Sequence, residues 1–222
     1  MSQLIHTLRQ QLPATQVITD DLRRLAYGTD ASFYRLIPQV IAVIESENDL
    51  KSVLTAARAN KTPVTFRAAG TSLSGQAISD GVLALIGESF ATYEINANAS
   101  KVKVGPGIIG GEVNRRLAPH GKKIGPDPAS IGTAKIGGIA ANNASGMCCG
   151  TAENSYRTLA GMRVMLADGT LLDSEDPASI AAFKQSHGAL LGELERLGRD
   201  TRANTKLAER IRHKFKIKNT TG

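Results

Sequence analysis

The chain has 222 residues, of which 41% are hydrophobic, enough to bury the core of one domain or of two small lobes. Aromatic residues make up 4% and tryptophan is absent, which argues against base recognition by stacking; no run of about 18 apolar residues predicts a membrane span, and the N-terminus lacks the apolar centre of a secretory signal. The net charge is +7. The two cysteines, Cys148 and Cys149, are adjacent and cannot link distant segments, so we expect a reduced, cytoplasmic protein.

The positive charge is concentrated near the C-terminal end. Residues 196–218 contain nine basic and two acidic residues, and this difference equals the net charge of the whole chain. A solvated basic helix, or one that faces a part of the protein beyond this chain, is the favoured interpretation. An acidic partner is the alternative.

The N-terminal part reads as a β-α-β unit preceded by a short helix. The helix covers residues 2–12, and the apolar run 39–45 is typical of a buried strand. Asn48 or Asp49 can cap the helix that follows. The run 62–67 predicts the second strand of the unit.

The rest of the chain mixes hairpins, a long loop and helices. In chain order we expect an apolar strand at 81–86, a hairpin formed by 91–95 and 101–104, a helix at 111–121, an irregular stretch at 125–150, a hairpin at 159–174 with an Asp-Gly turn, and polar helices from 177 onward.

Gly105, Gly107 and Gly110 spell G-x-G-x-x-G, the pattern of a Rossmann nucleotide-binding turn. The strand before them, "KVKV", alternates in polarity, whereas a Rossmann strand is buried on both faces. The acidic residue expected about 20 positions on would be Asp127, which lies between two prolines in a loop. A turn that joins a strand to a helix is the favoured interpretation.

A phosphate site is better predicted at "RAAGTSLSGQA", residues 67–77, directly after a strand. Small side chains let several backbone N–H groups approach one anion, and the hydroxyls of Thr71, Ser72 and Ser74 can add donors. Arg67 could also pair with phosphate. An ordinary flexible loop is the alternative.

The stretch 125–151 is long and poor in charge, and loops of this kind are usually functional. Gly137, Gly138 and Gly146 would let the backbone approach a flat ring system, and Asn142 and Asn143 supply neutral amides. A poorly ordered loop is the alternative.

Five blocks together resemble a known family. "PQVIAVIESENDL", "RAAGTSLSGQA", "GPDPAS", "KIGGIAANNASG" and "GMRVMLADG" occur in the order typical of the FAD-binding domain of FAD-linked oxidases, the vanillyl-alcohol-oxidase-like superfamily. The chain looks most like the branch of D-lactate, glycolate and D-2-hydroxyglutarate dehydrogenases. "LAYGTDASFYRLIP" resembles large bacterial members that carry an additional iron–sulfur domain.

The resemblance implies an α+β fold with two lobes and FAD held noncovalently between them. It divides the chain into an N-terminal helical lead-in (1–36), an FAD-binding domain (37–175, with lobes at 37–80 and 81–175) and a basic helical segment (176–222) that leads to a cap domain beyond the chain.

The same resemblance assigns site residues. Ala68 to Gly75 would hold the pyrophosphate, Pro128 to Ser130 and Gly137 to Gly146 would follow the phosphates, ribose and flavin, and the backbone at Val164 would meet the adenine. The expected cofactor-binding residues are Arg67, Ala68, Ala69, Gly70, Thr71, Ser72, Ser74, Gly75, Pro128, Ser130, Gly137, Gly138, Asn142, Asn143, Ser145, Gly146 and Val164.

The implied function is the FAD-binding portion of an oxidoreductase that oxidises a D-2-hydroxy acid and passes electrons to a second acceptor. None of the four histidines lies in a flavin-binding block, so the catalytic residues are unassigned and the isolated chain is expected to be inactive. We expect no metal site, since an iron–sulfur cluster would require residues beyond this chain, and no specific nucleic-acid partner. The full-length protein would be cytoplasmic or peripheral to the inner membrane. The alternative is a non-catalytic module whose basic tail contacts nucleic acid or acidic lipid.

Overall fold

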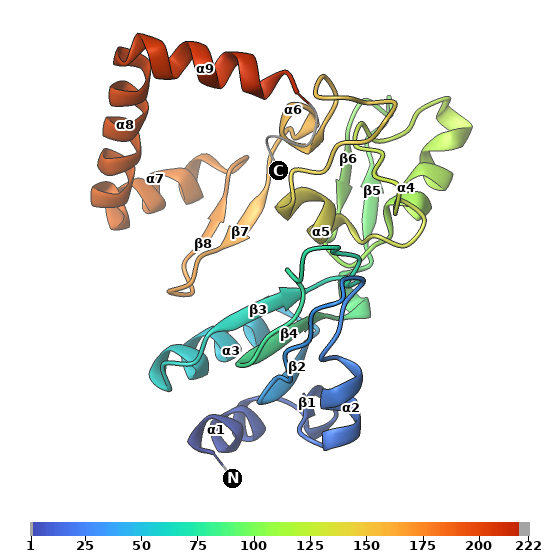
Figure 1. Ribbon diagram of the computed structural model, residues 1–222, viewed down its shortest axis with the longest axis vertical. Helices are drawn as coiled ribbons and strands as arrows, with labels where there is room; N and C mark the ends of the chain where they lie inside the picture. The colour runs from blue at the N-terminus through green and yellow to red at the C-terminus, as the bar shows by residue number, and fades with distance from the viewer. Residues whose placement is uncertain (1, 218–222) are drawn as a thin grey trace.

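The first lobe is built on a four-stranded sheet. The computed structural model describes residues 2–217 and shows two lobes and a helical extension (Figure 1). The strands of the first sheet are β1 (Val17–Ile18), β2 (Val40–Ile44), β3 (Val64–Arg67) and β4 (Val82–Ile86). They lie in the order β1-β2-β4-β3, with β2, β4 and β3 parallel and β1 antiparallel to β2. The three apolar strands predicted from the sequence are confirmed.

Helices cover this sheet on one face. These are α1 (Gln3–Gln11) and α3 (Glu47–Ala59), and their buried side chains Leu8 and Val53 pack in one cluster with Val40 of β2. Ile41 points to the opposite face, where the chain around Tyr27 contacts it. Because β2 is buried on both faces, its sequence is continuously apolar. Each fully buried Leu or Val contributes about 1.5–3 kcal/mol to folding.

α3 begins at a cap that differs from the predicted one. The hydroxyl oxygen of Ser46 accepts the N–H of Asp49 at 3.1 Å, and the hydroxyl donates to the carboxylate of Asp49 at 2.8 Å. The prediction of Asn48 or Asp49 as cap was therefore wrong. Asp49 occupies the third helical position, and its other carboxylate oxygen accepts the N–H of Glu45 at 3.0 Å, so the two side chains together fix the start of the helix.

The second lobe contains a hairpin and a helix. β5 (Tyr93–Ile95) and β6 (Val102–Val104) pair antiparallel, and α4 (Gly110–Leu117) follows. Since β6 is the return arm of a hairpin, the G-x-G-x-x-G pattern is not a Rossmann turn. A Cβ atom at Gly105 would collide with the carbonyl of Phe90, and one at Gly110 would lie 2.6 Å from the side chain of Ile131. These glycines allow close packing of the turn.

The remaining elements of the two lobes are short. They are the α-helices α2 (Asp21–Ala26), α5 (Ile136–Ala141) and α6 (Ser155–Thr158), the strands β7 (Arg163–Met165) and β8 (Leu171–Asp173), and the 3₁₀ turns η1 (Ala14–Gln16), η2 (Glu88–Phe90) and η3 (Ala118–His120). β7 and β8 form the expected hairpin, and Gly169 in its turn has a φ of +87°. The long stretch 125–150 contains α5.

The sheet of the first lobe extends beyond the expected lobe boundary. We placed residues 81–175 in the second lobe, but β4 lies between β2 and β3. The lead-in is also part of the first lobe, because it supplies α1 and β1. A sheet's strand order does not follow from the order of its strands along the chain, which explains the difference.

The C-terminal extension is helical, as expected. It comprises α7 (Pro177–Ser186), α8 (Gly188–Ala203) and α9 (Thr205–Phe215), and Figure 1 shows it beside the second lobe. The end of the predicted basic segment, residues 218–222, lies outside the described residues. Among residues 2–217, no helix combines the length and apolar character needed to cross a bilayer. The expected α+β architecture with two lobes and a helical extension is confirmed.

Candidate cofactor site

The predicted phosphate segment begins where the parallel strands end. Ile44 of β2 pairs with Ile86 of β4, and Arg67 at the end of β3 pairs with Leu85, so the carboxyl ends of the strands share one edge. Ligands of open parallel sheets bind outside this edge. Residues 68–77, here called the phosphate loop, leave β3 at this edge and lie between the first sheet and α5 (Figure 1).

The phosphate loop presents unpaired backbone donors. Gly70 and Gly75 have φ values of +71° and +73°, a conformation that glycine adopts readily. Among the hydrogen bonds of residues 2–217, the N–H groups of residues 70–73 and of Gly75 have no protein acceptor. The hydroxyl oxygen of Ser72 accepts the N–H groups of Ser74 and Gln76, each at 3.2 Å, and so fixes the turn. Free N–H groups in a tight turn are suited to an anion such as a pyrophosphate.

The side chain of Arg67 is engaged by the protein itself. Its Nη1 atom donates to the carbonyls of Tyr27 at 3.2 Å, Thr29 at 2.6 Å and Ala77 at 3.4 Å. A Cβ atom at Gly70 would lie 2.6 Å from Nη2, so the guanidinium lies directly beneath the loop. Burial lowers the pKa of Arg67, and the nearby Asp30 opposes that shift. The structure therefore gives Arg67 a role in holding the loop, which the sequence did not indicate.

Residues of the N-terminal lead-in, 1–36, form hydrogen bonds with the phosphate loop. A carboxylate oxygen of Asp30 accepts the N–H of Ala77 at 3.2 Å, and the N–H of Ala31 donates to the carbonyl of Gly70 at 3.0 Å. Partial burial would raise the pKa of Asp30, but hydrogen bonds from Ser32 and Ala77 outweigh it and lower the pKa below its ordinary value. The carboxylate is thus ionised at neutral pH and fixes the Ala77 end of the loop, while the N–H of Ala31 fixes Gly70.

The two predicted cofactor segments meet at α5. A Cβ atom built on Gly138 would lie 3.6 Å from the Cβ of Ala68, at the start of the phosphate loop. The neighbouring Gly137 packs on Pro106, where a Cβ atom would lie 2.9 Å from that of the proline. Glycine is therefore needed at Gly137 for the close approach to the turn before α4, whereas at Gly138 a methyl group would make an ordinary contact with the loop.

The loop after α5 is folded on itself rather than disordered. Asn142 ends α5, and Asn143 has a φ of +42°, with its side-chain oxygen accepting the N–H of Tyr156 at 2.8 Å. The carboxylate of Asp127 accepts the N–H groups of Cys148 and Cys149 at 3.3 and 3.2 Å. A Cβ atom on Gly146 would collide with Asp127, the neighbour of Pro128. Asp127 thereby joins two predicted segments, 128–130 and 137–146.

Val164 lies apart from these residues, on the β7–β8 hairpin. The N–H of Leu166 donates to the carbonyl of Thr170, and the N–H of Ser174 donates to the carbonyl of Met162. Hydrogen-bonded pairs alternate along an antiparallel ladder, so the N–H and carbonyl of Val164 are used in pairing with Leu172. The backbone groups on the open edge of β7 consequently belong to the residues on either side, Arg163 and Met165.

A groove of about 510 Å³ separates this hairpin from the first lobe. It is lined by Leu54, Ala57, Arg58, Thr62, Val64, Phe66, Met165, Ala167 and Asp168. The hairpin and β3 are therefore neighbours, although they are about 100 residues apart in the sequence.

Sequence reasoning missed three residues that shape the site. Besides Asp30, these are Tyr34, whose ring would lie 3.0 Å from a Cβ atom on Gly75, and Lys135, whose Nζ donates to the carbonyl of Ile86 at 3.3 Å. The signal for the first two was the block "TDASFY", which we read as family resemblance without assigning a contact.

Known proteins are similar to this chain in sequence. The glycolate oxidase subunit GlcD of Escherichia coli is 28% identical over 197 residues, an alignment that covers 84% of this chain and 40% of that protein. The D-2-hydroxyglutarate dehydrogenase of Escherichia coli is 26% identical over 195 residues, covering 86% of this chain and 19% of that enzyme. The chain thus spans less than half the length of either relative.

A solved structure and a family model also match this chain. The structure of Physcomitrella patens BBE-like 1 superposes with a TM-score of 0.67 over 78% of this chain and 37% of that chain, at 18% identity, which shows a common fold. The model of the FAD binding domain family matches residues 38–175, and this range contains both the phosphate loop and α5. The chain therefore belongs to the FAD binding domain family, with FAD as its cofactor.

Proposed function

We propose that this chain binds FAD noncovalently as part of a flavoprotein oxidoreductase that oxidises a D-2-hydroxy acid of the D-lactate, glycolate or D-2-hydroxyglutarate class. The observation that most supports the proposal is the meeting of Ala68 and Gly138 beside the free N–H groups of residues 70–73. The names of the two Escherichia coli relatives support the substrate class.

Each part of the site has a distinct task in this proposal. Bound FAD supplies a hydride acceptor for the substrate carbon. The phosphate loop donates its free N–H groups to the pyrophosphate, with hydroxyl donors from Thr71 and Ser74. α5 brings backbone close to the cofactor because Gly138 has no side chain. The open edge of β7 offers the N–H and carbonyl groups of Arg163 and Met165 to the adenine ring.

Substrate oxidation also needs a base for the hydroxyl proton and a cation for the carboxylate. Segments 67–77 and 125–151 contain no histidine. In the described structure His6 contacts Gln10, and His187 pairs with Asp168. We therefore assign the base and the carboxylate clamp to parts of the full-length protein outside this chain, and electrons would pass from FAD to a second acceptor.

Titration of the purified chain with FAD and with FMN tests the binding proposal. We expect flavin absorbance to remain with the protein after gel filtration and FAD to bind more tightly than FMN, because FMN lacks the adenosine half. Equal affinities would remove the adenine contact from the proposal. A colourless protein that retains neither flavin would support the non-catalytic alternative.

Anaerobic mixing of the FAD-loaded chain with D-lactate, glycolate and D-2-hydroxyglutarate tests whether substrate oxidation needs residues outside this chain. We expect no saturable bleaching of the flavin, since hydride transfer requires the substrate to be held about 3–3.5 Å from the acceptor. Stereospecific bleaching by this chain alone would place a complete active site within residues 1–222.

A further inference from the structure

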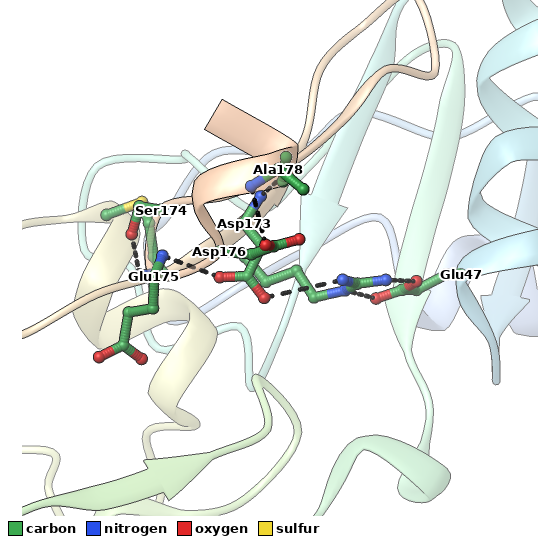
Figure 2. Close-up of polar contacts among 9 residues, drawn as sticks. Glu47, Asp173, Ser174, Glu175, Asp176 and Ala178 are labelled. Carbon is green, nitrogen blue, oxygen red and sulfur yellow. Dashed lines mark hydrogen bonds and ion pairs between the residues drawn. The ribbon is translucent and has the colours of Figure 1, made fainter. Parts of the chain in front are cut away.

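A bidentate ion pair joins the β7–β8 hairpin to the first lobe. Arg163 donates from Nε and Nη2 to the two carboxylate oxygens of Glu47, at 2.6 and 2.8 Å. Figure 2 shows the carboxylate of Glu47 meeting the guanidinium from one side while that of Asp173 lies on the other. The two paired residues are 116 positions apart, so the contact reports tertiary arrangement rather than local sequence.

Arg163 also has a partner within its own hairpin. It lies opposite Asp173 across the β7–β8 ladder, with Nη1 3.8 Å from the carboxylate. Asp173 is fixed in turn, because its N–H donates to the hydroxyl of Ser179 at 2.9 Å and its carboxylate accepts the N–H of Glu175 at 3.0 Å. The hydrogen bonds with Arg163 lower the pKa of Glu47, and the same bonds raise the pKa of Arg163. Both groups are therefore charged throughout the neutral range.

Glu47 marks the edge of the sheet at which the phosphate loop begins. It is the first residue of α3, three positions after the end of β2, and the parallel strands β2 and β3 end at the same edge. Arg163 supplies a backbone group on the open edge of β7. The ion pair thus connects a residue at the pyrophosphate side to a residue at the proposed adenine side, while a groove of about 510 Å³ lies between the hairpin and the body of α3 and β3.

We propose that Glu47 and Arg163 are positioning residues, which set the separation between the phosphate loop and the β7 edge so that both halves of FAD are bound together. This inference rests on the proposed FAD site. An exposed ion pair adds little to overall stability. A rigid spacing between two contacts nevertheless improves the affinity of a ligand that must reach both, because less order is lost on binding.

The test compares FAD and FMN binding to Glu47→Gln, Arg163→Met and the charge reversal Glu47→Arg/Arg163→Glu. Arg196→Met is the matched control, because Arg196 is similarly exposed and forms ion pairs with two carboxylates, Glu193 and Asp200, on α8. We expect each single variant to lose about 5- to 10-fold in FAD affinity, FMN affinity to stay unchanged, and the control to match wild type. The reversal should recover only part of the loss, because the new carboxylate at position 163 faces Asp173.

Three outcomes overturn the inference. One is unchanged FAD affinity in both single variants. Another is an equal loss for FAD and FMN, which would indicate general damage to the fold. The third is a loss in Arg196→Met as large as in Arg163→Met. If the wild-type chain takes up no FAD, the proposed function itself fails, and the positioning role that rests on it fails with it.

Discussion

Ala68 and Gly138 bring the two lobes into contact at the start of the phosphate loop. A Cβ atom on Gly138 would meet the Cβ of Ala68 at 3.6 Å, an ordinary van der Waals distance. The same helix is fixed to the first sheet by Lys135, whose Nζ lies 3.3 Å from the carbonyl of Ile86 and 3.1 Å from the carboxylate of Glu88. The start of α5 therefore contacts the chain at the carboxyl ends of both β3 and β4.

Adjacent glycines of α5 should respond oppositely to the same substitution. Gly138→Ala adds a methyl group at an ordinary contact distance, and alanine favours helix by up to about 1 kcal/mol over glycine, so the apo-protein should be as stable as wild type or more. Gly137→Ala places the methyl 2.9 Å from Pro106 and should destabilise the fold by about 1–3 kcal/mol. Thermal denaturation of both apo-variants measures this. A less stable Gly138→Ala would contradict the arrangement of Ala68 and α5.

Charge beside the phosphate loop should weaken FAD binding. Leu73 in the loop is 77% exposed and Leu22 on α2 is 78% exposed, so each can be replaced without disturbing a core. Leu73→Asp places a carboxylate near the pyrophosphate, where repulsion of about 1 kcal/mol per close charge lowers affinity roughly 5-fold. Leu22→Asp adds the same charge elsewhere and should bind FAD normally. Isothermal titration at low salt compares the two, and equal losses would remove the loop from the phosphate site.

The local elements were predictable because their sequence patterns act over short distances. "VIAVI" is apolar at every position, as a strand buried on both faces requires, and "KVKV" alternates, as a hairpin with one wet face requires. The turn at Gly169 and the stop at Gly121 follow from glycine's tolerance of positive φ. The glycine-containing loops were recognised for the same reason.

Contacts between distant residues were not predictable in this way. An arginine at the start of a glycine-rich loop suits phosphate or buried carbonyls equally well, and Arg67 contacts three carbonyls. Asp30 reaches Ala77 across 47 positions, and no local pattern records such a partner. The pairing register of β7 and β8 was also not predictable, because it is set by the turn and the pairing. In this register the backbone groups of Val164 face β8, so we now propose the adenine contact at its neighbours Arg163 and Met165.

Replacement of Arg67 should separate its structural role from the predicted phosphate contact. In Arg67→Met three carbonyls lose their donor, and the apo-protein should lose about 2–3 kcal/mol of stability. Arg67→Lys should recover only part of this, because an ammonium lacks the planar fork of a guanidinium. Urea denaturation without flavin measures the loss. An unchanged apo-stability combined with weaker FAD binding would restore the direct pairing with phosphate that the sequence suggested.

The turn of the β7–β8 hairpin should contribute to stability in a pH-dependent way. The N–H of Thr170 donates to Asp168 at 2.8 Å, and the ring of His187 adds a second contact at 3.0 Å; together they lower the pKa of Asp168 to about 2 from 3.8. Since the folded-state pKa lies below the unfolded value, the ionised carboxylate stabilises the fold above about pH 4, and this contribution disappears as the pH falls from about 4 to about 2. The stability difference between wild type and Asp168→Asn should therefore shrink over that interval.

In His187→Ala the pKa of Asp168 should rise only part of the way to 3.8, because the amide of Thr170 remains and is the larger cause. Carboxyl-carbon NMR titration measures the midpoint directly, and a full return to 3.8 would show that His187 rather than the Thr170 amide holds the carboxylate in its ionised form.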